Sequence, residues 1–267
     1  MNRFLPLYFL LFTAAPLAAQ VPDNTDDLSE FIFSRNHLSV SIMGGIAMKA
    51  KVSTDQYGLG SSNQIAFGGG INYHSNFNRN LSLIFGLHLA APIRNIEYNI
   101  PKDEFSPPLD YDLFHNGGIS QEVAFMLRLP VTMETRFFYG QNKFWNISGG
   151  VSLNYGELHE EHSTHIVEHD NQAVNYFNTS LFTNNDNKPW LNYHFGGGHS
   201  WILRNKNLIS AGLIANLSFT NFTRGNYTVE VPGKPLIEGD YSFKGSYIGF
   251  TLSYIFTGAK KRMKAYS

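Results

Sequence analysis

Cysteine is absent from this 267-residue chain, which excludes disulfide bonds, thiolate metal sites, a cysteine nucleophile and a lipid-modified N-terminal cysteine. Charge is also scarce, at 15% of residues against about 25% in ordinary soluble domains. The net charge of −1 leaves no basic footprint, so no nucleic-acid partner is expected. Beyond the first residues, no apolar run approaches the roughly 20 residues of a transmembrane helix. If the mature chain lies in a membrane, it must close into a barrel, because lipid tolerates no unpaired strand edge.

Aromatic residues and glycine, by contrast, are abundant. The chain holds 22 Phe, 14 Tyr and 24 Gly, with 43% hydrophobic residues. Its mean hydropathy is −0.20, which is ordinary for a soluble protein. Few charges, many aromatic rings and average hydropathy are typical of strands that alternate between an apolar face and a neutral polar face. Transmembrane barrels have this property.

Residues 1–19 have the features of an export signal. Arg3 supplies a positive charge, residues 4–17 are apolar apart from Thr13 and two prolines, and small residues follow before Gln20. We therefore predict a signal peptide over 1–19 and a periplasmic N-terminal extension over 20–35. The protein is expected in the outer membrane, with its lipid as one partner.

Eight later segments alternate apolar and polar residues with a period of two, which predicts β-strands with one apolar and one polar face. The predicted strands cover residues 38–49, 64–74, 81–90, 122–136, 145–155, 191–201, 209–219 and 247–256. Short connections rich in Asn, Gly and basic residues alternate with much longer ones. This layout predicts an all-β fold: an eight-stranded antiparallel transmembrane β-barrel over residues 36–256, with short periplasmic turns and long outer loops. Residues 257–267 form a basic C-terminal tail.

A soluble lipocalin-like barrel is the alternative that also alternates, but its polar face would point to water. The polar face here consists mainly of Gly, Ser, Asn and Thr, whereas a water-facing surface carries far more Lys and Glu. Small neutral side chains suit the narrow interior of an eight-stranded barrel. The sequence favours the membrane barrel.

The polar face of the fourth predicted strand carries Glu122, Arg128, Glu134 and Arg136. Charges inside a narrow lumen must find partners or remain costly, so we predict a lumenal network in which these carboxylates and guanidinium groups pair. The alternative is a selectivity filter along a pore. Eight strands leave no continuous channel by default, which favours the network.

The segment 157–170 holds four histidines among five carboxylates. Imidazole and carboxylate groups are suitable ligands for Zn²⁺ or Cu²⁺. We expect this segment to be a solvated acidic surface loop, and the alternative is that it binds a metal ion. The candidate ligands are His159, His162, His165 and His169. No cofactor is otherwise expected.

Small outer-membrane barrels also include lipid-modifying enzymes. The segment His74-Ser75-Asn76 faintly resembles a His-x-Ser-Asn motif of lipid A 3-O-deacylases, but the residue between His and Ser is missing. Neighbouring strand residues point to opposite faces, so this His and Ser cannot act together. No catalytic residue is assigned, and the chain is not expected to be an enzyme.

Two segments resemble a known family. Residues 127–133, Leu-Arg-Leu-Pro-Val-Thr-Met, and the closing strand at 245–256 are similar to strands of the outer-membrane β-barrel family common in Bacteroidota, the porin-family or PorT-like group. The basic tail departs from the family pattern, in which the chain stops at a terminal aromatic residue. The resemblance implies fold and location but no catalytic residues.

The expected function is therefore that of a non-enzymatic barrel, acting through its outer loops or as a subunit of an envelope complex with protein partners. A small porin-like channel and a lipid-modifying enzyme are the alternatives.

Overall fold

The computed structural model describes residues 32–117, 125–140, 142–156, 159–170, 172–183 and 188–258. The predicted signal peptide lies outside the described residues, as do Glu122 and positions 259–267 of the basic tail. Within the described ranges, no helix is both long and apolar enough to cross a bilayer.

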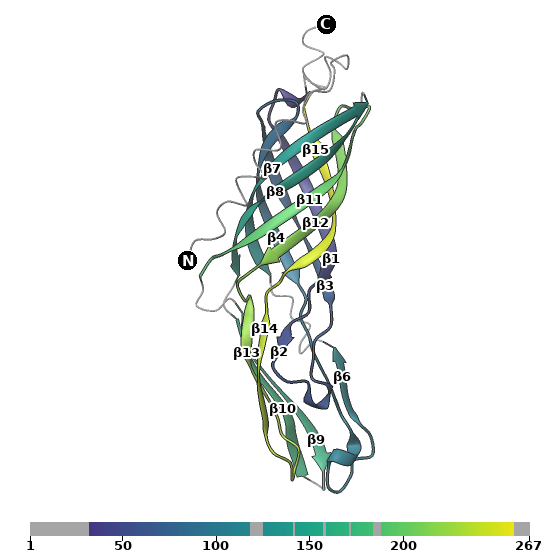
Figure 1. Ribbon diagram of the computed structural model, residues 1–267, viewed down its shortest axis with the longest axis vertical. Helices are drawn as coiled ribbons and strands as arrows, with labels where there is room; N and C mark the ends of the chain where they lie inside the picture. The colour runs from purple at the N-terminus through teal and green to yellow at the C-terminus, as the bar shows by residue number, and fades with distance from the viewer. Residues whose placement is uncertain are drawn as a thin grey trace.

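Eight antiparallel strands close into a barrel in the order β1-β15-β12-β11-β8-β7-β4-β3 (Figure 1). Their bounds are β1 His37–Ala47, β3 Gln64–Asn76, β4 Leu81–Pro92, β7 Met126–Gly140, β8 Lys143–Gly156, β11 Trp190–Ile202, β12 Leu208–Ser218 and β15 Tyr247–Phe256. The predicted eight-stranded antiparallel barrel is confirmed. The fourth strand differs most from its prediction at 122–136, since β7 starts and ends later.

The wall of the barrel presents its apolar face outward. The exposed apolar residues include Leu38, Val40, Ile42, Ile65, Phe67, Ile71, Phe85, Leu87, Leu89, Leu127, Leu129, Val131, Ile147, Val151, Leu153, Leu191, Phe195, Leu213, Ile248, Phe250 and Leu252. They form a continuous belt because they recur at every second residue on neighbouring strands. The alternate residues, mostly Ser, Asn, Gly and His, point into the lumen.

Inward glycines let the wall coil tightly. Gly45 on β1 faces Gly249 on β15, and a Cβ at Gly45 would lie 2.3 Å from the backbone oxygen of Ile248. No larger side chain fits there unless the backbone moves. The abundance of glycine noted in the sequence is thus partly explained by strand crowding inside a small barrel.

At the end of the barrel opposite the short turns, the long connections fold into an extension with its own sheets (Figure 1). The larger sheet has the order β2-β14-β13-β10-β9, and a hairpin pairs β5 with β6. The bounds are β2 Lys51–Val52, β5 Ile96–Ile100, β6 Leu113–Gly117, β9 His159–His169, β10 Gln172–Thr183, β13 Thr223–Val229 and β14 Ile237–Phe243. The expected loops are therefore largely β-structure. We call the two ends of the barrel the turn end and the extension end.

Two hydrophobic clusters close the barrel. The larger begins at the extension end with Met43, Ala47 and Tyr247 and continues into the extension, where Tyr98 and Phe177 are buried. The smaller lies at the turn end and consists of Ile32, Phe33, Phe144, Ile202, Leu208 and Ile255, with Phe138 packed against it. The lumen is therefore apolar at both ends and polar between them.

Ile32 and Phe33, the first described residues of the N-terminal segment, form a plug at the turn end of the barrel. Residues 32–33 are helical, and the side chains of Ile32 and Phe33 are 1% and 2% exposed. The rings of Phe138 and Phe144 meet Phe33 edge-on, each at 5.5 Å between centroids. Two residues of the segment predicted as a periplasmic extension, Ile32 and Phe33, thus lie inside the barrel, because these apolar side chains gain burial there.

Candidate functional site

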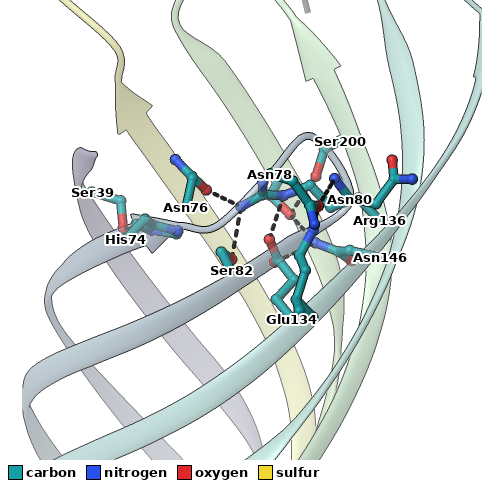
Figure 2. A network of polar contacts seen from close by, with 12 residues as sticks. Ser39, His74, Asn76, Asn78, Asn80, Ser82, Glu134, Arg136, Asn146 and Ser200 are labelled. Atoms are coloured by element: carbon teal, nitrogen blue, oxygen red, sulfur yellow. Dashed lines mark hydrogen bonds and ion pairs between the residues drawn. The ribbon is translucent and has the colours of Figure 1, made fainter. Parts of the chain in front are cut away.

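The lumenal polar network is built on the inward face of β7, where Arg128, Glu134 and Arg136 are all buried. Figure 2 shows Arg136 at the centre of its contacts near the turn end. Nε of Arg136 donates to Oε1 of Glu134 at 2.8 Å, and Nδ2 of Asn146 donates to the other carboxylate oxygen at 3.0 Å. The structure brings Glu134 and Arg136 together as an ion pair.

Arg136 also joins the network to the plug. Its Nη2 donates to Oδ1 of Asn76 and to Oγ of Ser82, both at 2.8 Å. Its guanidinium stacks over the ring of Phe33, with 4.3 Å between the guanidinium carbon and the ring centroid. Three strands and the N-terminal segment therefore meet at one cation, which fixes the plug against the lumenal charges.

Arg128 does not join that ion pair. Its Nη2 donates to Oδ1 of Asn216 at 2.8 Å, and its Nη1 contacts the hydroxyl of Tyr247. Longer contacts reach Ser152 and Met43 at 3.5 and 3.9 Å. Arg128 forms no ion pair with Glu134: six residues along one strand separate them, about 20 Å at 3.3 Å per residue. Glu122, the other expected partner, lies outside the described residues.

Between the two arginines lies a cavity of about 140 Å³. Three histidines line it, and each is hydrogen-bonded to the wall. Nε2 of His74 lies 2.9 Å from Oγ of Ser39, that of His88 lies 2.7 Å from Oδ1 of Asn72, and that of His194 lies 2.7 Å from Oγ1 of Thr132. All three lie on the inward faces of their strands, β3, β4 and β11.

Ser39 and His74 form a hydroxyl–imidazole pair of the kind that nucleophilic catalysis uses. The two residues are 1% and 5% exposed inside the closed lumen, so no lipid substrate can reach them. Ser75 follows His74 on the opposite face of β3, as the sequence indicated. The pair serves to fasten β1 to β3.

The histidine-rich segment forms β9, an edge strand of the five-stranded sheet. Its His162 is exposed and lies 2.9 Å from Glu160, whereas His165 is half-buried on the opposite face. His159 and His169 are paired with opposite ends of β10, which spreads the candidate ligands along the strand; the side chains of these two lie outside what the structure describes. Among the described residues, no cluster of three or more His, Asp or Glu side chains is arranged to hold a metal.

His165 belongs instead to an aromatic contact between the hairpin and the sheet. Its Nδ1 contacts the hydroxyl of Tyr98 on β5, and its ring centroid lies 5.1 Å from that of His115 on β6. Burial lowers the pKa of His165 below its ordinary value, and the neighbouring His115 lowers it further. Burial also raises the pKa of Tyr98. The contact therefore favours neutral rings.

A buried ion pair at the base of the extension has no counterpart in the sequence predictions. Arg94 follows β4, and its Nη2 donates to Oε2 of Glu161 on β9 at 2.6 Å. Its Nη1 donates to the hydroxyls of Thr183 and Thr223 at 2.7 and 2.8 Å. One guanidinium thus joins β9, β10 and β13 to the rim of the barrel. The two charged residues are 67 positions apart in the chain, so no local spacing signals the pair.

No family model and no curated protein matches this chain. Among solved structures, it is similar to the outer membrane protein OprG from Pseudomonas aeruginosa, with 12% identity, a TM-score of 0.39, and coverage of 82% of this chain and 95% of that one. It is also similar to the outer membrane protein AlkL, with 13% identity, a TM-score of 0.32, and coverage of 96% and 97%. The outer membrane protein Ail from Yersinia pestis matches at 12% identity and a TM-score of 0.28, with coverage of 83% and 100%.

Proposed function

We propose that this chain is an outer-membrane β-barrel protein that acts through a rigid β-structured extension at the cell surface, without catalysis and without an open pore. One observation carries the proposal. The barrel exposes its apolar residues and buries its polar ones, whereas the extension does the reverse. The two parts are thus built for different surroundings, lipid for the barrel and water for the extension.

The dimensions of the barrel support the membrane location. Its strands have 10 to 15 residues, and a transmembrane β-strand needs about 9–11. Aromatic residues stand at both margins of the exposed belt, as interfacial girdles do. Those near the turn end are Tyr73, Tyr139, Trp145, Trp201 and Phe256, and those near the extension end are Tyr155, Tyr193 and Phe219.

The lengths of the connections support the orientation. Outer-membrane barrels have short turns on the periplasmic side and long connections outside. The turn end of this chain would then face the periplasm, and the extension would face the medium. A β-structured extension with a buried aromatic core holds its surface in one shape, which suits recognition of an envelope protein or other surface partner better than mobile loops do.

The closed lumen argues against the porin-like alternative. The plug of Ile32 and Phe33 fills the turn end, and the cluster around Met43 and Tyr247 fills the extension end. Planar-bilayer recordings with purified protein test this directly. We expect no steady ion conductance, and a sustained conductance would favour the small channel instead.

The absence of cysteine provides a clean test of location and orientation. Single cysteines are introduced as Pro235→Cys in the extension and Arg204→Cys at the turn end, both at exposed positions. A membrane-impermeant maleimide added to intact cells should label the first variant and not the second. Both should react after the outer membrane is permeabilised. Recovery of the protein in the soluble periplasm, or labelling of the turn-end cysteine alone, would contradict the proposal.

Action through the extension is tested by comparing two versions of the protein. Proteins that co-purify from detergent-solubilised outer membrane are compared for the wild type and for Glu161→Ala, which removes the buried ion pair at the base of the extension. A partner that the extension binds should be lost from the variant while the barrel still shows its heat-modifiable gel shift. If mass spectrometry showed that the mass of lipid A changes when the protein is expressed, the protein would instead be an enzyme.

A further inference from the structure

Arg128 carries a buried charge that no described side chain neutralises. The residue is 2% exposed, and its hydrogen-bond partners are a phenol, an amide oxygen, a hydroxyl and a thioether. Among the described residues of the lumen, the other arginine is Arg136, whose charge is already matched by Glu134. The described lumenal side chains therefore leave one positive charge at the extension end of the cavity.

The carboxylate of Glu134 cannot serve both arginines. It also lines the cavity, but one of its oxygens accepts from Arg136 and the other from Asn146. At about 20 Å from Arg128 along β7, it lies far beyond ion-pair distance. A buried guanidinium normally has a carboxylate or another anion beside it, because unpaired charge is costly away from water.

Hydrogen-bond donors around Arg128 are also in excess. Buried donors without a partner include Nε of Arg128 and Nδ2 of Asn216. Nδ2 of Asn192 and Nδ1 of His194 are buried and unpartnered as well, on the strand beside β12. Two amide oxygens, on Asn154 and Asn192, also lack partners. Those oxygens can accept hydrogen bonds, directly or through water, but they cannot balance a full charge.

The cavity supplies the space. Arg128, His88 and His194 are among the residues that line it, and its volume is about 140 Å³. A water molecule occupies about 30 Å³ in the liquid, so an ion with a few waters fits there. Apolar clusters lie beyond it at both ends of the barrel. The site thus combines space with the positive charge of Arg128 and the polar side chains of His88 and His194.

We propose that this cavity binds a small monovalent inorganic anion, with chloride as the representative ion, held beside the guanidinium of Arg128. The anion accepts hydrogen bonds from Nε of Arg128 and Nδ1 of His194, which belong to cavity-lining residues and lack partners, and it balances the charge that Glu134 does not reach. The bound ion acts as a structural component of the barrel. This inference rests on the lumen alone and does not depend on the surface role proposed for the extension.

The first experiment refolds the full mature chain in detergent in sodium chloride, sodium bromide or sodium gluconate at equal ionic strength. The anion is present throughout folding, so that it can enter the lumen before the barrel is complete. The melting temperature should be higher in chloride and bromide than in gluconate, an organic anion much bulkier than the halides. Above the dissociation constant it should rise by about 3–5 °C for each tenfold increase in chloride. Equal melting temperatures in all three salts would overturn the proposal and assign the cavity to water.

Matched variants separate a bound anion from a general salt effect. Arg128→Gln removes the unbalanced charge and should abolish the difference between chloride and gluconate. The double variant Glu134→Gln/Arg136→Gln removes one charge of each sign, so the lumen keeps its net charge. This variant should be less stable but should keep the chloride effect. An equal chloride effect in Arg128→Gln would contradict the site.

A crystallographic measurement covers the case in which Arg128→Gln does not fold. Wild-type protein refolded and crystallised in bromide should show an anomalous scattering peak in the lumen beside Arg128. A cavity with ordered water and no bromide peak would overturn the proposal, whatever the variants do.

Discussion

The barrel and its extension are both antiparallel β-structure in one chain, yet they are inside out relative to each other. On β7, Leu127, Leu129 and Val131 face outward and Arg128 faces inward. In the extension, Phe177 and Tyr227 are 0% and 1% exposed in the interior. Strand periodicity is the same in both regions, and only the side that carries the apolar residues changes.

The contrast shows that alternation locates strands, whereas the surroundings decide which face is outside. In lipid, an exposed Leu costs nothing and the polar side chains must satisfy one another in the lumen. In water, the extension must bury its aromatic rings to be stable. The buried ion pair Arg94–Glu161 lies at the junction between the barrel and the extension.

The largest expected effect comes from breaking that junction. Glu161→Ala leaves Arg94 buried without its carboxylate, which should cost about 3–5 kcal/mol of stability in the extension. Limited proteolysis should then cut the connections between β8 and β11 rapidly, while the heat-modifiable gel shift of the barrel persists.

The double variant Arg94→Met/Glu161→Met is the control, because it removes both charges and keeps comparable volume. Replacement of a buried ion pair by apolar residues is often neutral or stabilising. Protease resistance near the wild-type level is therefore expected. Loss of the heat-modifiable gel shift of the barrel in Glu161→Ala would mean that the two regions fold as one unit. That result would contradict the view that the barrel and the extension are stabilised separately.

The next effect concerns the belt. Leu129→Arg places a charge on the outward face of the barrel, where it should cost about 2–4 kcal/mol near the middle of the bilayer. Little folded barrel should form in membranes. The matched variant Ile166→Arg lies on β9 at an exposed position of the extension and should assemble normally. Equal assembly of both, measured by gel shift, would indicate that the barrel does not lie in lipid.

The fold of the barrel could be predicted because strand alternation and connection length are local signals. Gly45, Leu127 and Arg128 each point to the side of the barrel wall that their position in the alternating pattern indicates, inward for Gly45 and Arg128 and outward for Leu127. The extension was predicted only as long loops, since its sheet pairs segments far apart in the chain, such as β10 with β13. The partners of Arg128 and Arg94 could not be predicted, because parity gives the face of a strand but not which residues meet across the lumen or the junction.

A smaller effect is expected at the plug. Ile32→Val removes one methylene from a side chain that is 1% exposed at the turn end, so it should cost about 1 kcal/mol. The same substitution at exposed Ile166 in the extension should leave stability nearly unchanged. Thermal unfolding of the refolded proteins in detergent measures both. No difference between them would mean that the N-terminal segment does not fill the barrel end in solution.

The smallest effect should appear at the hairpin contact as the pH falls. The pKa of His165 is lowered from its ordinary 6.5, first by burial and then by His115, so the unfolded state binds its proton more readily than the folded state does. The contact is therefore fully stable above about pH 6.5 and loses stability as the pH falls below that value toward the lowered pKa. Amide hydrogen exchange in β5 and β6 should quicken over this range, while exchange in the barrel strands should not.

His165→Gln should remove the pH dependence, because glutamine takes up no proton in this range. The rings that face this position, Tyr98, Tyr176 and His115, would then contact an uncharged side chain at every pH. His162→Gln, at an exposed position on the other face of β9, should leave the dependence intact, and an equal loss in both variants would assign the effect to another group.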